Sequence, residues 1–209
     1  MTNAISRNGA SGRANVRYMV QLAVLVAILL VLEFTGIGMI KTLGLEFTIM
    51  QVPVIIGAIV MGPAAGGILG GVFGLLSFWE CFGKSLFGAS LLAINPFLTF
   101  LVCVPTRLLM GLCCGWIFRG LHRVDHTMGQ WIAFGTASLS GALLNTVFFM
   151  GALVLCFYQT DYIQSFAAGM PNVLAFIVAF VGVQGMLEAV ICAVAGTAVS
   201  RALYRTLHC

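Results

Sequence analysis

Six apolar stretches divide the chain, and each is close to the length of a membrane-crossing helix or somewhat shorter. An α-helix needs about 20 apolar residues to cross the hydrocarbon core of a bilayer. Unbroken apolar runs favour helices over a β-barrel, whose strands would alternate polar and apolar positions. We therefore predict an all-α integral membrane protein with six transmembrane helices. Their predicted ranges are 17–39, 48–62, 64–79, 97–120, 129–157 and 172–203.

The second and third of these stretches belong to one uncharged segment, 48–79, which Gly62-Pro63 interrupts near its middle. Pro63 would clash with the preceding turn of a continuous helix, so we predict a hairpin of two short helices, with one continuous helix as the alternative. After the break, glycines recur at every fourth position: Gly66, Gly70 and Gly74. In water each would cost about 1 kcal/mol relative to Ala. In lipid the same spacing provides a flat ridge for another helix.

Composition and charge support a membrane protein and suggest its orientation. The chain is 61% hydrophobic and 8% charged, whereas soluble domains carry about 25% charged residues. Six crossings put both termini on one side, and the positive-inside rule makes that side cytoplasmic. Residues 1–16 are then a polar cytoplasmic tail, and 17–205 form the membrane domain. Basic residues at the ends of apolar segments give no indication of nucleic-acid binding. Seven arginines flank the cytoplasmic side: Arg7, Arg13, Arg17, Arg119, Arg123, Arg201 and Arg205.

Polar residues within the apolar stretches are the candidates for function, because they are costly in lipid and usually face an interior or a cavity. Arg107 and Glu188 are the charged ones. They could pair with each other, or with helix backbones, to hold the bundle together; alternatively, one or both line an aqueous pocket and meet a polar solute. Several amides at one level of the bilayer favour the second interpretation. The candidate substrate-binding residues are Gln51, Asn95, Arg107, Asn145, Gln184 and Glu188.

Other kinds of site find little support in the sequence. There is no Walker motif, no paired-His metalloprotease motif and no Gly-x-Ser-x-Gly elbow. His122 and His126 are four residues apart with Asp125 between them, so a metal site is conceivable, but a solvated loop is favoured. We predict no metal and no cofactor. In the first helix, Ala23 and Ala27 form a small-residue patch that would admit close approach by another helix.

Four segments resemble the substrate-binding S components of energy-coupling factor (ECF) vitamin transporters. The closest likeness is to the pantothenate-type branch, with the folate-type branch near it. The resemblance implies six helices, a vitamin bound near the outer side under the loop that joins helices 1 and 2, and assembly with a transmembrane coupling subunit and two cytoplasmic ATPases. It also implies that Ala23 and Ala27 contact the coupling subunit, and that the S component topples in the membrane to release its substrate. The segments are TIMQVPVIIGAIVMGPAAGGILGGVFGLLSF, INPFLTFLVCVPTRLLMG, GALLNTVFFMGAL and GMLEAVICAVAG.

The resemblance therefore implies a non-enzymatic, multi-pass protein of a bacterial cell membrane that binds a water-soluble vitamin, most simply pantothenate, for ATP-dependent uptake. Arg107 would meet the carboxylate of pantothenate, and Asn145, Gln51 and Gln184 its amide and hydroxyls. The pantothenate-type pattern often has histidine where this chain has Gln51, so the vitamin stays open. Alternatives are another vitamin such as folate, a structural or regulatory membrane protein, and a self-sufficient secondary transporter, although the chain shows no repeated halves.

Overall fold

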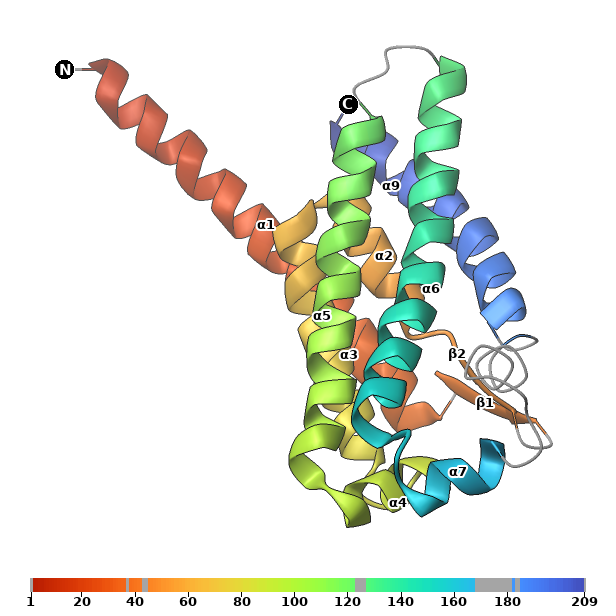
Figure 1. Cartoon of the computed structure of the whole chain (residues 1–209). Helices are drawn as coiled ribbons and strands as arrows, with labels where there is room; N and C mark the ends of the chain where they lie inside the picture. Colours follow the sequence, from red (N-terminus) through yellow and green to blue (C-terminus); the bar gives the residue numbers. More distant parts are fainter. Residues whose placement is uncertain are drawn as a thin grey trace.

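The structure is a computed structural model that describes residues 2–36, 38–42, 45–122, 127–167, 182 and 185–208. It is predominantly helical (Figure 1). Within these described residues, four helical segments are long and apolar enough to cross a membrane, and α2 is a shorter apolar helix. The long segments are Asn15–Thr35, Pro96–Leu121, Trp131–Phe157 and Gly185–Thr206. The elements are α1 (Thr2–Thr35), β1 (Met39–Thr42), β2 (Leu45–Thr48), α2 (Gln51–Val60), α3 (Pro63–Glu80), α4 (Leu86–Ile94), α5 (Pro96–Leu121), α6 (Thr127–Phe157), α7 (Asp161–Ala167), the π-helix η1 (Cys192–Gly196) and α9 (Thr197–His208).

Most predicted helix boundaries agree with the structure to within a few residues, and the differences lie at the two ends of the chain. Helix α1 begins at Thr2, so the predicted polar tail continues the first helix, and it ends at Thr35 rather than residue 39. The first part of the predicted helix 172–203 lies outside the described residues; from Gly185 onward the chain is helical.

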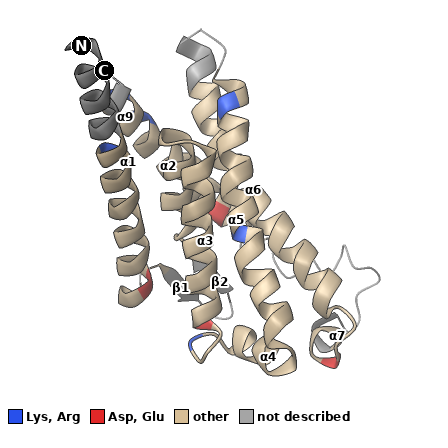
Figure 2. Ribbon diagram, turned by 90° about the vertical axis from the view of Figure 1, so that its left-hand side faces the viewer, with Lys and Arg blue, Asp and Glu red and all other residues tan. Residues whose placement is uncertain are grey.

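Three of the connections between the predicted helices contain short elements of their own. The first holds β1 and β2, which pair antiparallel from Met39↔Thr48 to Thr42↔Leu45. β-Branched and aromatic residues in both strands favour this pairing. The other two loops hold α4 and α7. Figure 1 shows the β-hairpin, α4 and α7 at the end of the bundle opposite to both chain termini. Figure 2 shows the long middle parts of the helices with few charged positions.

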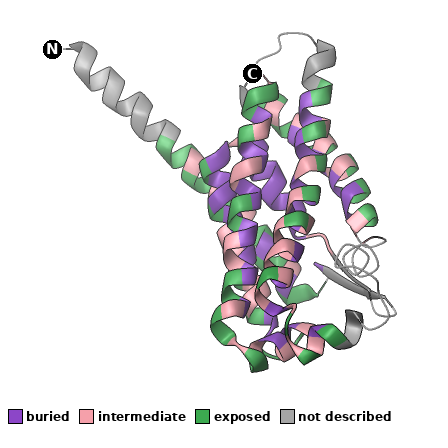
Figure 3. Ribbon diagram, in the orientation of Figure 1, coloured by how far each residue is buried: buried purple, intermediate pink, exposed green. Residues whose placement is uncertain are grey.

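The interruption at Gly62-Pro63 produces two separate helices, which confirms the predicted hairpin. Gly62 has φ +98°, a conformation that glycine adopts without the steric cost of a side chain, and Pro63 occupies the first turn of α3. Every residue of α2 from Gln51 to Ile59 is buried, as expected for a helix that is apolar on all sides. Figure 3 shows these buried positions at the centre of the bundle. Helix α2 is therefore the core around which α3, α5, α6 and the last helix pack.

The glycines of α3 pack directly against the backbone of α5, as their spacing predicts. A Cβ on Gly66 would collide with the carbonyl group of Gly111, and a Cβ on Gly70 with the carbonyl group of Arg107. A Cβ on Gly74 would come within 2.7 Å of the Cα of Val104. We call this contact of Gly66, Gly70 and Gly74 with α5 the glycine seam. It fixes how deep each residue of α5 lies relative to α3.

Candidate functional site

Arg107 lies in the interior of α5 and is 8% exposed. Its Nη1 donates hydrogen bonds to the carbonyl oxygens of Val102 and Cys103, both at 3.2 Å. Pro105 lies inside the same helix and removes one backbone hydrogen bond from this region. The side chain thus folds back along its own helix, and part of its hydrogen-bonding capacity is met by backbone carbonyls, which is one of the two structural roles that the sequence left open.

Two aromatic rings flank the guanidinium group. Its Cζ lies 5.4 Å from the ring centroid of Phe73 on α3 and 4.7 Å from that of Phe149 on α6. Cations within about 6 Å of an aromatic face are attracted by the ring quadrupole. The Nε of Arg107, in contrast, is buried and has no hydrogen-bond partner. The charge is therefore held between three helices while one donor remains unused.

Asn145 lies on α6 one turn before Phe149, so both side chains share a face of that helix. Since Phe149 contacts Arg107, the structure brings Asn145 to the side of α6 that faces the arginine. Asn145 is 7% exposed, and its Oδ1 is buried without a hydrogen-bond partner. An unpaired donor on α5 and an unpaired acceptor on α6 thus belong to the same region of the bundle.

Glu188 connects the last helix to the start of α2. Its Oε1 accepts a hydrogen bond from the backbone N–H of Thr48 at 2.9 Å, and its Oε2 accepts one from Nε2 of Gln51 at 3.1 Å. Glu188 is 4% exposed, and Gln51 is fully buried. Because Gln51 donates to the carboxylate, its own Oε1 points elsewhere and is left without a hydrogen-bond partner.

Of the remaining two predicted substrate-binding residues, Asn95 and Gln184, only Asn95 lies within the described residues. Asn95 caps the N-terminus of α5: its Oδ1 accepts hydrogen bonds from the backbone N–H groups of Phe97 at 3.0 Å and Leu98 at 3.2 Å. A side-chain oxygen at this position satisfies amides that the helix cannot pair internally. Gln184 lies outside the described residues.

Three contributors to this region were not predicted from the sequence. The rings of Phe73 and Phe149 flank Arg107, and the backbone N–H of Thr48 binds Glu188. The spacing of Phe149 four residues after Asn145 is a signal that could have found it, because residues four apart share a helix face. The contribution of Thr48 has no such signal, since any residue except proline carries a backbone N–H.

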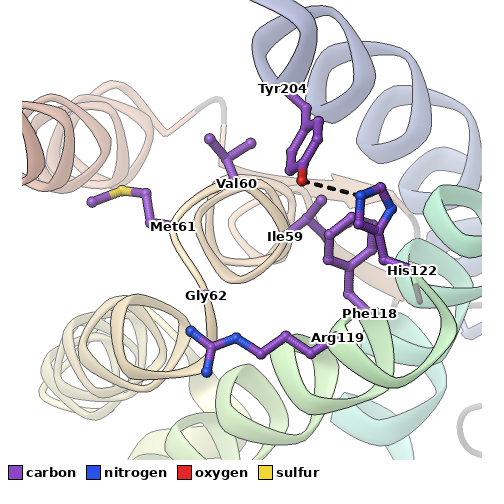
Figure 4. A pocket seen from close by; sticks show the side chains of 8 residues that line it. All are labelled: Ile59, Val60, Met61, Gly62, Phe118, Arg119, His122 and Tyr204. Atoms are coloured by element: carbon purple, nitrogen blue, oxygen red, sulfur yellow. Dashed lines mark hydrogen bonds between the residues drawn. The ribbon is translucent and has the colours of Figure 1, made fainter. Parts of the chain in front are cut away.

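A cavity of about 310 Å³ lies between α2, α5 and α9 (Figure 4). The Tyr204 hydroxyl and His122 Nε2 form a hydrogen bond of 3.1 Å across it, and Arg119 extends toward Gly62. On α5, Phe118 of this cavity is about 16 Å along the axis from Arg107. The described residues contain no group of metal-ligating side chains, and Asp125 and His126 lie outside them. The cavity is lined by Ile59, Val60, Met61, Gly62, Phe118, Arg119, His122 and Tyr204.

Ala23 and Ala27 lie on an exposed face of α1. Large apolar residues on the same helix are exposed as well, including Val20 at 57% and Val24 at 53%. The small-residue patch is therefore not used for packing within the described part of this chain.

Comparison with known proteins identifies the family. Residues 17–199 match the family described as ECF transporter, substrate-specific component. The chain belongs to this family. A curated relative, the pantothenate transporter PanT of Leuconostoc mesenteroides subsp. mesenteroides, is 30% identical over 147 residues, which cover 69% of each chain. This S component is thus a substrate-binding part of a transporter rather than an enzyme, and S components bind a small vitamin and work with an ECF module.

Proposed function

We propose that this S component binds pantothenate from outside the cell and delivers it by ATP-dependent uptake, together with a transmembrane coupling subunit and two cytoplasmic ATPases in a bacterial cell membrane. The name of the Leuconostoc relative supports the choice of vitamin. The chain carries no Walker motif, which is consistent with ATP hydrolysis in partner subunits.

The observation that carries this proposal is a set of buried polar atoms that the protein leaves without a partner. Each unpaired buried donor or acceptor costs about 1–3 kcal/mol, so such atoms require a reason to persist. A polar solute that hydrogen-bonds them would recover this free energy on binding. Four of the seven such atoms in the described residues lie in the region of the candidate site: Thr48 Oγ1, Gln51 Oε1, Arg107 Nε and Asn145 Oδ1. The other three are His122 Nδ1, Ser138 Oγ and Ser200 Oγ.

The types of these groups match the chemistry of pantothenate, which has one carboxylate, an amide and two hydroxyls. Arg107 is a permanent cation with a free Nε–H, and it binds the carboxylate. Gln51 and Asn145 each offer an unpaired oxygen, and these accept from the amide N–H and the hydroxyls. Glu188 orients Gln51 by binding its Nε2. Gln184, four positions before Glu188 in the sequence, completes the set, whereas Asn95, whose Oδ1 caps α5 about 18 Å along that helix from Arg107, stays outside it.

We further propose that the chain crosses the membrane six times with both termini in the cytoplasm. The two termini lie at one end of the bundle (Figure 1), and the arginines at that end satisfy the positive-inside rule. Helices α2 and α3 are the two short crossings. The predicted substrate residues then lie in the outer half, and the β-hairpin, α4 and α7 form the outer surface above them.

In this arrangement the exposed small-residue face of α1 docks on the coupling subunit. Ala23 and Ala27 lack a partner helix in the described part of the chain, and small residues allow two helix backbones to approach closely in lipid. The neighbouring Val20 and Val24 would add apolar contact area on either side.

Equilibrium binding of radiolabelled pantothenate to the purified protein in detergent tests the proposal. We expect saturable binding by the wild type that excess unlabelled folate does not displace. Arg107→Ala and Asn145→Ala should each weaken it. No saturable binding by wild type would reject pantothenate, and displacement by folate would point to the folate-type branch.

The rival function is purely structural: Arg107 and Glu188 would only hold the bundle together. The hydrogen bonds from Arg107 to backbone carbonyls favour it. The double variant Arg107→Met/Glu188→Leu discriminates between the two. Transport predicts loss of binding and uptake with the fold retained, whereas the structural function predicts that uptake continues.

A further inference from the structure

A second cavity, of about 510 Å³, lies between α6 and α9 near the end that carries the termini. The two helices run side by side here: the guanidinium Cζ of Arg201 lies 3.1 Å from the ring centroid of Trp131, and Thr197 faces Gly135. None of the residues assigned above to pantothenate lines this cavity. Its lining is Trp131, Ala193, Val194, Thr197, Ala198, Arg201, Ala202 and Arg205.

Among the described residues, no acidic side chain pairs with the cationic part of this groove. Thr197, Arg201 and Arg205 follow one another at intervals of four, so they share one face of α9. Within the described ranges, no hydrogen bond or salt bridge reaches Arg201 or Arg205. The Cζ of Arg201 lies over the ring of Trp131, a contact that uses none of its N–H donors in a hydrogen bond. Two guanidinium groups one turn apart therefore form a site for an anion with several acceptor oxygens.

The rest of the groove is apolar and open to the outside of the bundle. Val194 is 68% exposed, and Ala198 and Ala202 are exposed as well. The small side chains leave space beside α6, and the chain is wound as a π-helix over Cys192–Gly196, where the groove begins. The floor continues from the arginines along a helix segment that is apolar enough to lie within the bilayer.

We propose that this groove binds an anionic glycerophospholipid. The phosphate accepts hydrogen bonds from Arg201 and Arg205. The part of one acyl chain nearest the headgroup lies along the apolar floor formed by Val194, Ala198 and Ala202. Trp131, which is 51% exposed, lies at the level of the headgroup, where tryptophans concentrate in membrane proteins. A phospholipid has both a phosphate for the arginines and an acyl chain for the adjoining apolar floor, so one molecule matches both parts of the groove. Basic pockets between membrane helices bind such headgroups on the cytoplasmic side; the assignment to that leaflet rests on the proposed topology.

Fluorescence quenching of Trp131 by brominated lipids tests the proposal directly. The variant Trp79→Phe/Trp116→Phe leaves Trp131 as the sole tryptophan. The purified protein is titrated in mixed micelles with brominated phosphatidylglycerol or with brominated phosphatidylcholine. We expect half-maximal quenching at about a thirtyfold lower mole fraction of the anionic lipid, because each of the two arginines contributes about a fivefold preference for it. Equal quenching by the two lipids would overturn the proposal.

Two charge variants in this background separate a specific site from a general charge effect. Arg201→Gln/Arg205→Gln should abolish the preference for phosphatidylglycerol. Arg17→Gln/Arg119→Gln removes the same net charge outside the groove and should retain it. A preference that survives in the first variant, or is lost equally in both, would contradict the groove as the binding site. So would complete reversal of quenching by millimolar glycerol phosphate, which would indicate a site for soluble phosphates.

Pantothenate binding is measured on the same samples, so failure of this inference can be told apart from failure of the proposed function. Loss of the lipid preference in Arg201→Gln/Arg205→Gln, with unchanged pantothenate binding and a single monodisperse peak in size-exclusion chromatography, supports the lipid site. If Arg201→Gln/Arg205→Gln does not fold, Arg201→Lys/Arg205→Lys is measured in its place. Lysine keeps the positive charge but lacks the planar set of N–H donors, so this variant should retain only part of the preference for phosphatidylglycerol.

Discussion

The glycine seam and the polar region around Arg107 lie next to each other, and they are built on opposite principles. In the seam, the backbones of α3 and α5 are in contact, and there is no room for a single additional carbon at Gly66 or Gly70. Around Arg107, buried polar atoms lack partners. The close packing of the glycine seam stabilises the fold, whereas the unpaired polar atoms around Arg107 destabilise it. The two regions meet at one residue, because Gly70 packs on the carbonyl of Arg107 and so sets the depth of its side chain.

The largest expected effect comes from closing the space in the seam. Gly70→Ala places a Cβ against the carbonyl of Arg107, and helix backbone cannot yield as a flexible side chain can. We expect a loss of about 3 kcal/mol in the free energy of unfolding, or roughly 6–12 °C in unfolding temperature. Gly71→Ala is the matched control, since its Cβ would find its nearest neighbour at 3.9 Å. Thermal unfolding in detergent measures both, and equal stability of the two variants would show that the seam is not close-packed.

Replacing Arg107 should separate stability from binding. Arg107→Met keeps an apolar stem of similar length between Phe73 and Phe149 but removes the charge. We expect pantothenate binding to weaken at least about 30-fold, since loss of a desolvated charged contact costs about 2–5 kcal/mol. The unfolding temperature should stay constant or rise, because replacing buried charge with apolar groups is often neutral or stabilising. A variant that loses stability and keeps its affinity would assign Arg107 to the scaffold.

A smaller effect is expected at Asn145, which provides one uncharged acceptor. Asn145→Leu removes a buried oxygen that has no partner within the protein. Binding of pantothenate should weaken about tenfold, the value of one hydrogen bond of about 1.4 kcal/mol. Stability should not fall, because the variant no longer buries an unpaired polar atom. Equilibrium binding and thermal unfolding on the same preparation check both, and an unchanged dissociation constant would remove Asn145 from the site.

Glu188 should act on binding only through Gln51. Glu188→Gln retains the size of the side chain but weakens its hydrogen bonds to Gln51 and Thr48, because charge-assisted hydrogen bonds are about twice as strong as neutral ones. We expect roughly threefold weaker binding. In a double-mutant cycle, Gln51→Leu should make the effect of Glu188→Gln disappear. Independent, additive effects of the two substitutions would show that Glu188 contacts the solute by another route.

The smallest effect on the isolated S component is expected at the exposed small residues of α1. Ala23→Trp/Ala27→Trp should leave pantothenate binding and unfolding temperature unchanged, since neither side chain is buried within the described part of the chain. Uptake by cells that also express the ECF module should be lost, because the bulky rings prevent close helix contact. Ala23→Ser/Ala27→Ser keeps the small size and should transport normally. Uptake by the Trp variant would place the docking surface elsewhere.

The seam could be predicted from the sequence because its cause is local and periodic. Glycines at every fourth position, and a proline that ends the preceding helix, leave few alternatives for the segment 48–79. The β-hairpin at 39–48 was not predicted, since two strands of four residues give too short a pattern to distinguish from a loop. The helical start of α1 was also missed, because its polar composition resembles that of a tail.

The candidate site could be predicted only as a set of residue types. Burial of Gln51, Arg107, Asn145 and Glu188 follows from their positions in apolar stretches. Which of them share partners depends on how the helices are rotated about their axes, and the spacing of residues within one helix does not determine that rotation for helices far apart in the chain. The bond between Gln51 and Glu188 joins residues 137 positions apart. Asn95, chosen for its amide and depth, proved to cap a helix, a role that its position just before Pro96 also suggests.

Ligand-induced thermal stabilisation of the wild type and of Arg107→Met tests most directly whether the polar region around Arg107 binds the solute. At a pantothenate concentration of 100 times the dissociation constant, the wild type should gain about 2.7 kcal/mol of stability, which is roughly 5–11 °C in unfolding temperature. Arg107→Met should unfold at or above the wild-type temperature without ligand, and pantothenate should raise its unfolding temperature by no more than about a third of the wild-type shift. An equal shift in both proteins, or none in the wild type at saturating pantothenate, would contradict the proposal that the unpaired polar atoms are there to bind the solute.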